Sequence, residues 1–263
     1  MSLKHRLIPV LLLQNGLLVR SEEFRLHQII GNPLNEVQRF NEWNVDELIY
    51  LDITTDDVYD VGRNDHKVKR TEGAPAVLAA VSAHCFMPLT WGGRIKSVDD
   101  MWRCIENGAD KVAINTSAVD SPSLITEGAN RFGSQAIVVS IDVSGDSSTG
   151  WRVITEGGAR ATDLEPAAWA KEVEDRGAGE LLLQHVERDG AGEGYDVELI
   201  REVSGAVSIP VIACSGVGRY EHYVEGIEAG AAAVAAANIW HFKELSDRGG
   251  KRALAKAGID VRL

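Results

Sequence analysis

Two aspartates in this sequence stand where a carboxylate could act on a bound ligand. Asp142 ends the apolar run AIVVSID, and Asp52 ends the run LIYLD. Such runs predict strands buried on both faces, so each carboxylate would be fixed at a strand end, where it could work as a general acid or base. Each could instead cap a loop or pair with a nearby cation, and for Asp52 we favour this structural role. His185, which closes the run ELLLQH, has the same two interpretations.

Glycine-bearing turns follow two other apolar runs and could hold phosphate. The runs read MPLTWGGRI and IPVIACSGVG, and the stretches that contain them, 88–115 and 210–238, repeat at an offset of 122 residues. Each stretch continues through a helical pattern to a Gly-Ala pair and then to an apolar strand that ends in Asn. Backbone N–H groups in such turns can bind phosphate. The repeat therefore predicts two phosphate sites in two similar halves of one fold.

Short apolar runs alternate with helical patterns along the chain. We expect strands over residues 7–13, 47–53, 86–91, 111–114, 136–141, 180–184, 207–213 and 232–236. Helices are expected over residues 35–43, 66–82, 97–107, 121–131, 166–176, 197–204, 220–229 and 243–257. Eight alternating strands and helices in 263 residues are typical of a (β/α)8 TIM barrel. An open doubly wound sheet is the alternative, but the repeat favours a closed α/β barrel with half-barrel internal symmetry, in a single domain over residues 1–263.

Side chains at the carboxyl ends of the strands form the active site in barrels of this kind. This rule selects polar and glycine positions that we expect to bind phosphate or substrate: Gly92, Gly93, Asn115, Thr116, Ser215, Gly216 and Asn238. The loop ERDGAGEGY adds Asp189 and Gly190, which could bring a carboxylate and N–H groups over the barrel mouth. That loop could also be rich in Gly and Asp for backbone reasons alone.

Charged residues stand at the opposite ends of four predicted strands. They are Arg6, Glu47, Lys111 and Glu180, each at or just before a strand start. Their alternating signs predict a ring of salt bridges at the bottom of the barrel. We expect such a ring to stabilise the fold to an extent that depends on its burial.

Two insertions interrupt the regular alternation. Residues 14–33 form a long first loop, and long loops at this face of a barrel are often lids. Residues 150–160 are expected to form a small hairpin with its turn at Glu156, Gly157 and Gly158.

The composition excludes several classes of partner. The formal net charge of −12 argues against a nucleic-acid surface, and no Lys/Arg run or apolar stretch of about 20 residues suggests a membrane partner. The three cysteines lack C-x-x-C spacing and no signal peptide is expected, which predicts reduced thiols in a cytoplasmic protein. The His residues are isolated from Cys and from one another, so we expect no metal site and no cofactor.

Several segments carry a family resemblance. VDELIYLDIT, GADKVAINTSAV, RFGSQAIVVSID, RDGAGEGYDVELI, SIPVIACSGVG and the tail AGIDVRL resemble, in order and nearly end to end, the cyclase subunit of imidazole glycerol phosphate synthase. The resemblance implies a half-symmetric (β/α)8 barrel that takes ammonia from a separate glutaminase and condenses it with a ribulose-linked, doubly phosphorylated nucleotide. It also implies that the glutaminase docks at the barrel bottom. Ammonia would then pass through a gate formed by Arg6, Glu47, Lys111 and Glu180.

The active face departs from the pattern of that family. Asp142 matches the second of two catalytic aspartates, but Leu12 stands where the first would follow the motif I-P-C-L. The lysine of the first loop corresponds to Arg20, which keeps the charge and is expected to hold an anion. Other changes place Arg94, Cys214 and Ser215 at the phosphate turns and Asn238 at the eighth strand.

These changes resemble a branch of the family that is associated with glycosyl amidation in surface-polysaccharide biosynthesis. Its I-P-x-L-L-L motif, the following G-L-V run, and segments like EVQRFNEWNVDEL and CFMPLTWGG are similar to this sequence. That resemblance implies delivery of ammonia to a third, amidotransferase protein. Our leading hypothesis is therefore a barrel subunit that accepts ammonia for amidation of a sugar or sugar nucleotide. The alternatives are the histidine-pathway cyclase itself, a lyase, and a non-catalytic channelling module that activates the glutaminase.

Overall fold

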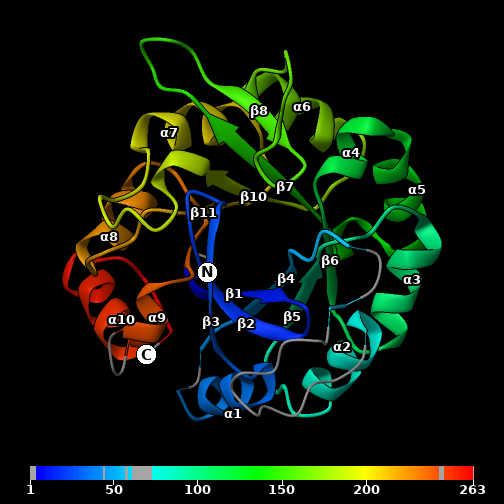
Figure 1. Cartoon of the computed structure of the whole chain (residues 1–263). Coiled ribbons are helices and arrows are strands. Elements are labelled where there is room, and N and C mark those ends of the chain that lie inside the picture. Colours follow the sequence, from blue (N-terminus) through cyan, green and yellow to red (C-terminus); the bar gives the residue numbers. More distant parts are fainter. Residues whose placement is uncertain (1–3, 44, 57–58, 61–72, 243–245, 263) are drawn as a thin grey trace.

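Parallel strands close into a barrel at the centre of the molecule (Figure 1). The computed structural model describes residues 4–43, 45–56, 59–60, 73–242 and 246–262. In ring order the strands are β10 (Glu180–His185), β11 (Val211–Cys214), β12 (Ala233–Ala236), β1 (Arg6–Gln14), β4 (Leu48–Asp52), β5 (Leu89–Gly92), β6 (Lys111–Ile114) and β7 (Ile137–Ser144). Parallel pairing of β7 with β10 closes the ring. The fold is therefore the predicted (β/α)8 TIM barrel and not an open sheet.

Helices surround the barrel (Figure 1). They are α1 (Pro33–Trp43), α2 (Ala74–Ser82), α3 (Val98–Glu106), α4 (Thr116–Asp120), α5 (Ser123–Phe132), α6 (Pro166–Asp175), α7 (Val197–Ala206), α8 (Glu221–Glu228), α9 (Ile239–Phe242) and α10 (Ser246–Lys256), with short 3₁₀ turns η1 (Ser134–Ala136) and η2 (Val186–Arg188). Each predicted helix overlaps one of them, and residues 66–72 and 243–245 of two predictions lie outside the described residues. None of the helices in the described ranges is long and apolar enough to span a bilayer.

Two barrel strands begin three or four residues later than predicted, in both cases just after a proline. β5 begins at Leu89 because Pro88 has no N–H to donate to a neighbouring strand. β11 begins at Val211, after Pro210, because the carboxylate of Glu174 accepts the preceding N–H groups of residues 208 and 209, at 2.8 and 3.2 Å. The apolar residues at the start of these runs therefore belong to loops.

Apolar side chains fill both faces of the strands, as the uninterrupted apolar runs predicted. One set points into the barrel and includes Ile8, Val10, Ile49, Val138, Leu182 and Ile212. The other packs between the strands and the helices and includes Leu7, Leu11, Tyr50, Trp91 and Leu181. Because successive strand side chains point to opposite faces, every barrel strand except β5 contributes to both sets, and the inward positions of β5 are Thr90 and Gly92. The strand ends are thus held rigidly.

The two halves of the barrel repeat one another at the residue level. β5, α3 and β6 correspond to β11, α8 and β12, and β5 and β11 begin at Leu89 and Val211, which are 122 positions apart. Gly108 and Gly230 have the same offset and similar left-handed backbones, with φ 99° and 111°. An added Cβ at either glycine would meet a serine side chain. These equivalences confirm the predicted half-barrel symmetry.

The two insertions both form hairpins above the barrel. Residues 14–33, which we expected as a long loop, contain β2 (Leu17–Glu22) and β3 (Leu26–Gly31), and β2 also pairs antiparallel with β1. The turn between β1 and β2 is Asn15-Gly16, with φ 51° and 76°, a two-residue hairpin signal that the sequence analysis missed. The second insertion forms the predicted hairpin, with strands β8 (Arg152–Thr155) and β9 (Arg160–Ala161).

Candidate functional site

A cavity of about 880 Å³ opens at the carboxyl ends of the barrel strands. Its wall is built from strand ends, from the loops that follow them, and from the β2–β3 hairpin. Among the residues predicted from the sequence, the following line it: Gly93, Asn115, Thr116, Asp142, Asp189, Gly190, Ser215, Gly216 and Asn238. The barrel therefore brings most of the predicted positions around one space.

Asp142 is buried at the inward face of β7, with 6% of the residue exposed. Its Oδ1 accepts hydrogen bonds from Ser140 Oγ at 3.1 Å and Gln184 Nε2 at 3.0 Å. Burial raises the pKa of Asp142 to about 6, although both hydrogen bonds favour the carboxylate, and the nearby charge of Asp189 adds to the rise. A carboxyl with this pKa can both accept and donate a proton near neutral pH.

Leu12 occupies the inward face of β1 and lines the cavity, with 9% of the residue exposed. β1 and β7 are four strands apart in a closed ring of eight, so Leu12 and Asp142 lie on opposite walls. Leucine cannot transfer a proton. Among the described residues of β1, the inward positions above the bottom ring are Ile8, Val10 and Leu12, and none carries an acid.

The first-half turn lies at the ends of β5 and β6. Gly93 and Arg94 line the cavity with left-handed backbones. Asn115 donates from Nδ2 to the carbonyl oxygen of Ser140 at 3.0 Å, and Thr116 Oγ1 accepts the N–H of Glu156 at 2.9 Å. These bonds fasten the β8–β9 hairpin and β7 to the same side of the cavity.

The second-half turn is covered by the β2–β3 hairpin. Asp189 accepts the N–H of Phe24 at Oδ2 (3.3 Å) and the N–H of Glu23 at its carbonyl oxygen (3.0 Å). Asn238 Nδ2 donates to the carbonyl oxygen of Ser21 at 2.7 Å. Burial raises the pKa of the Asp189 carboxyl. The hydrogen bond that this carboxyl accepts from the Phe24 N–H partly offsets the rise. The hairpin therefore acts as a cover that is fastened by two of the predicted binding residues.

Two of the predicted binding residues do not line the cavity. Arg20 lies on β2, where its guanidinium binds Gln28 Oε1 at 2.7 Å and Glu22 Oε1 at 3.1 Å. The hairpin strand carries this side chain away from the cavity wall. We had expected Arg20 to lie in a long loop, from which it could have reached an anion. Gly92 ends β5 and serves close packing instead, because an added Cβ would lie 2.7 Å from Leu51 and 2.9 Å from Ala113.

The surroundings of Asp52 and His185 favour the structural role that we gave as one of two interpretations for each. Asp52 reaches the cavity wall, but Thr54 Oγ1 donates to its Oδ1 at 2.6 Å and Tyr59 Oη to its Oδ2 at 2.9 Å. His185 is not part of the cavity wall, and its Nε2 lies 3.0 Å from the carbonyl oxygen of Gly145. Both side chains hold loops in place.

Sequence reasoning missed Ser140 as a partner of Asp142 and Lys96 as a cation of the cavity wall. Ser140 stands two residues before Asp142 in the same strand, and period-two alternation would have placed both on the inward face. Gln184 was noticed only as a strand end. Lys96 lines the cavity two residues after Arg94, which the sequence placed at the first phosphate turn. Among the described residues, no group of three or more His, Cys, Asp or Glu side chains could hold a metal ion.

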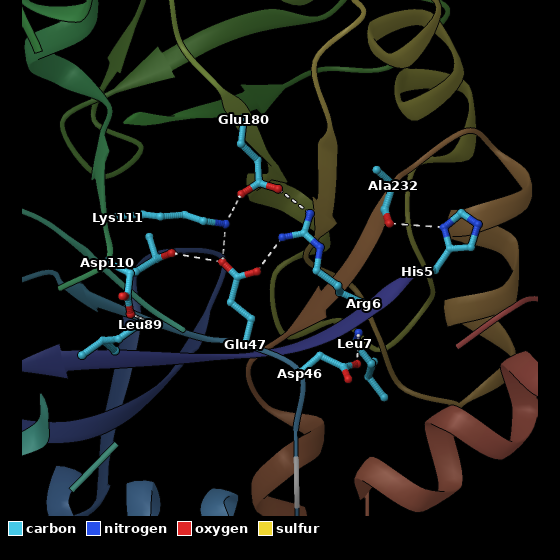
Figure 2. Close-up of polar contacts among 11 residues, drawn as sticks. His5, Arg6, Leu7, Asp46, Glu47, Leu89, Asp110, Lys111, Glu180 and Ala232 are labelled. Atoms are coloured by element: carbon cyan, nitrogen blue, oxygen red, sulfur yellow. Dashed lines mark hydrogen bonds and ion pairs between the residues drawn. The ribbon is translucent and has the colours of Figure 1, made fainter. Parts of the chain in front are cut away.

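At the opposite end of the barrel, four charged side chains form a closed ring (Figure 2). Arg6 binds Glu47 Oε2 at 2.5 Å and also binds Glu180. Lys111 Nζ lies 2.7 Å from Glu47 Oε1 and 2.8 Å from Glu180 Oε2. Each cation therefore contacts both carboxylates. Burial alone would lower the pKa of Arg6, but the charges and hydrogen bonds of Glu180 and Glu47 outweigh it and raise that pKa.

Comparison with known proteins identifies the family. A family model described as "Histidine biosynthesis protein" matches residues 6–246, which is most of the chain. The chain belongs to this family. It is 42% identical over 266 aligned positions to the imidazole glycerol phosphate synthase subunit HisF of Caulobacter vibrioides (strain NA1000 / CB15N), covering 99% of this chain and 97% of that protein. It is 44% identical over 259 positions to the subunit of the same name from Geobacillus thermodenitrificans, covering 98% of each.

These relatives confirm the resemblance to HisF-type barrels. They support the histidine-pathway cyclase, which we gave as an alternative, better than sugar amidation, which we gave as the leading hypothesis. The resemblance to the amidation branch receives no support from them. It rests on the departures at the active face, of which Leu12 is the most consequential for the chemistry.

Proposed function

We propose that this chain is the ammonia-accepting synthase subunit of a HisF-type amidotransferase, acting on a phosphorylated small molecule. The observation that carries the proposal is the placement of the charged ring and the acidic cavity at two ends of one barrel interior. Glu180 and Gln184 lie on the same inward face of β10, four residues apart, and Gln184 hydrogen bonds Asp142. Arg6 and Leu12 share the inward face of β1 in the same way.

Ammonia that enters at the ring would reach the cavity along the barrel interior. Above the ring the inward side chains include the apolar Ile8, Ile49, Val138 and Leu182 in the middle layer. Neutral ammonia can pass an apolar layer far more readily than an ion can, because burying an unpaired charge is costly. The ring would then admit ammonia from a glutaminase docked at the barrel bottom. The relatives are named as subunits of a synthase, which supports a partner of this kind.

In the cavity, Asp142 would serve as the acid/base group. Its pKa of about 6 suits proton transfer to and from nitrogen and oxygen atoms of a ligand near neutral pH. The glycine turns after β5 and β11 would hold phosphate groups through backbone N–H groups. The relatives favour the ribulose-linked nucleotide of imidazole glycerol phosphate synthesis as the acceptor, and ring closure to imidazole glycerol phosphate as the reaction.

A second candidate function, amidation of a sugar or sugar nucleotide with a third protein, is favoured by Leu12. Two cooperating acids can divide the proton transfers of a ring closure, and loss of one acid typically costs 10²–10⁴-fold in rate. On β1, across the cavity from Asp142, the described side chains that line the cavity are Val10 and Leu12, and both are apolar. A barrel that passes ammonia onward, or that catalyses a simpler addition, needs no second acid.

Turnover with free ammonia distinguishes the two acceptors. The purified chain is incubated with the ribulose-linked nucleotide and excess ammonium salt at high pH, so that no glutaminase is needed, and substrate loss is followed. Turnover that disappears in Asp142→Asn would establish the cyclase reaction. A folded chain without turnover would overturn that acceptor, and the sugar candidate would then be tested with a glutaminase, labelled glutamine and nucleotide sugars.

A further inference from the structure

The inward face of the β2–β3 hairpin carries a histidine that lines the cavity. His27 lies on β3 directly opposite Ser21 of β2, and both residues belong to the cavity wall. Two positions away on the same face, Val19 of β2 pairs with Ile29 of β3 and also with Leu12 of β1. Because alternate residues of a strand share one face, the surface that carries His27 is continuous with the surface that carries Leu12.

A buried carboxyl fastens the tip of this hairpin. Glu23 and Phe24 donate their N–H groups to the carbonyl oxygen and the side chain of Asp189, at 3.0 and 3.3 Å. Asp189 lies in the loop after β10 and is 7% exposed. Burial lowers the pKa of His27, while the charge of Asp189 opposes this change. The ring is therefore mainly neutral near pH 7, with a carboxylate close enough to stabilise its protonated form.

The carboxylate of Asp189 also lies near Asp142. β10 pairs with β7 so that Gln184 stands opposite Asp142, and Asp189 follows Gln184 by five positions. Burial is the main cause that raises the pKa of Asp142, and the charge of Asp189 adds to it. Burial likewise raises the pKa of Asp189, and the charge of Glu22 on β2 adds to that rise. His27 and Asp142 thus border the same part of the cavity, one on the hairpin and one on the barrel wall.

We infer that His27 is a second acid/base residue of the cavity, supported by the charge of Asp189, and that it supplies the proton transfer that Leu12 cannot. When ammonia adds to a carbonyl carbon of the ligand, the nitrogen lone pair forms the C–N bond and the π electron pair moves to oxygen. Neutral His27 accepts one proton from the nitrogen, and protonated Asp142 donates one to the oxygen. Solvent then takes a proton from His27 and returns one to Asp142. The inference deepens the proposed function, since it assumes that the barrel itself catalyses the addition.

Ammonium-dependent turnover of the ribulose-linked nucleotide measures the contribution of His27. We expect His27→Gln to lower kcat by about 10²-fold while thermal unfolding stays near that of the wild type. His84→Gln is the matched control, because His84 is exposed at the end of α2 and does not line the cavity. It should leave kcat unchanged.

The pH dependence separates proton transfer from a structural role of His27. Rates of His27→Gln and wild type are compared in the same ammonium buffer at each pH, so that the changing concentration of free ammonia cancels in their ratio. The ratio should rise toward one as the pH falls from about 8 to about 5, because protonated His27 of the wild type can no longer accept a proton. A structural defect would give the same ratio at every pH.

Histidine-selective ¹⁵N NMR follows the ring of His27 without turnover. Asp189→Asn should move the titration of His27 to lower pH, because the charge of Asp189 raises the pKa that burial lowers. An unchanged titration would overturn the support by Asp189.

The kinetic outcomes separate the inference from the proposed function. If the wild type turns over and His27→Gln keeps its kcat, or if the rate ratio does not depend on pH, the inference is overturned while the cyclase reaction stands. If the folded wild type shows no turnover, the cyclase acceptor of the proposed function fails, and the catalytic role of His27 fails with it.

Discussion

Leu12 and Asp142 lie on opposite walls of one cavity, on strands that are four apart in a ring of eight. The barrel thus presents an acid on one wall and an apolar side chain on the other. Asp142 is supported by Ser140 and Gln184, whereas Leu12 belongs to the apolar set that fills the barrel interior. Because of this asymmetry, proton transfer by a side chain is available at Asp142 and not at Leu12.

Leu12→Asp adds a second acid to the wall that faces Asp142. If the cavity retains the shape of a cyclase site, this change raises ammonium-dependent turnover of the ribulose-linked nucleotide. Burial of the new carboxyl lowers the free energy of unfolding by about 1–3 kcal/mol. Steady-state kinetics and urea unfolding check the two effects, with Leu12→Asn as the matched uncharged control. A folded Leu12→Asp protein with no gain would show that the pocket has been reshaped beyond this position and would favour sugar amidation.

Asp142→Asn should remove turnover and stabilise the protein at neutral pH. Folding raises the pKa of Asp142 from 3.8 to about 6, so the folded chain binds this proton more tightly than the unfolded chain does. The residue therefore lowers stability progressively as the pH rises from about 4 to 6, and the loss is constant above that. We expect Asp142→Asn to raise the free energy of unfolding by about 1–3 kcal/mol at pH 7.5 and by almost nothing at pH 4.

Urea unfolding at several pH values measures this dependence, and Asp146 supplies an opposite control. Hydrogen bonds from Ser148 and Thr149 lower the pKa of Asp146 to about 2. Its contribution to stability is therefore present at neutral pH and lost as the pH falls toward 2, so Asp146→Asn should destabilise the protein at pH 7.5 and not at pH 2. The same pH dependence in both variants would contradict the burial of Asp142.

Glu47→Gln tests the charged ring. Glu47 accepts hydrogen bonds from Arg6, Lys111 and Thr90, and its side chain is 3% exposed. Removing its charge leaves two partly buried cations with one carboxylate, which should lower the free energy of unfolding by about 2–4 kcal/mol. Asp260→Asn breaks an ion pair with Lys4 that is 57% exposed on both sides and should cost less than about 1 kcal/mol. Equal effects in urea unfolding would mean that the ring is as solvated as the surface pair.

Gly93→Ala tests the close approach of the first turn to β4. Gly93 and Gly258 both have left-handed backbones, with φ 95° and 80°, but only Gly93 has a backbone oxygen in the path of a Cβ, whereas nothing lies within 4 Å at Gly258. Gly258→Ala should therefore cost about 1 kcal/mol, and Gly93→Ala about 3 kcal/mol or more. Thermal or urea unfolding of the two variants measures the difference, and similar costs would show that β4 can move away from the turn.

The sequence was sufficient to predict the barrel, and most of the predicted site residues line its cavity, for a physical reason. Strands buried on both faces leave uninterrupted apolar runs, and the residue that ends each run must lie at the barrel rim. The charged ring was predictable because its members open strands with alternating sign. The position of Arg20 was not predictable in this way. Arg20 lies on a hairpin whose Asn-Gly turn we had interpreted as part of a long loop. The first residues of β5 and β11 were predicted wrongly because hydropathy does not determine them. Prolines and the Glu174 carboxylate determine where these strands begin.

Coupling to a glutaminase tests whether this barrel accepts ammonia at its charged ring. The purified chain is mixed with its cognate HisH-type glutaminase, and glutamine hydrolysis is measured with and without the barrel, together with formation of the complex by analytical ultracentrifugation. We expect a stable complex in which hydrolysis is faster than in the glutaminase alone. Absence of a complex, with an unchanged rate of hydrolysis and a folded barrel, would contradict it.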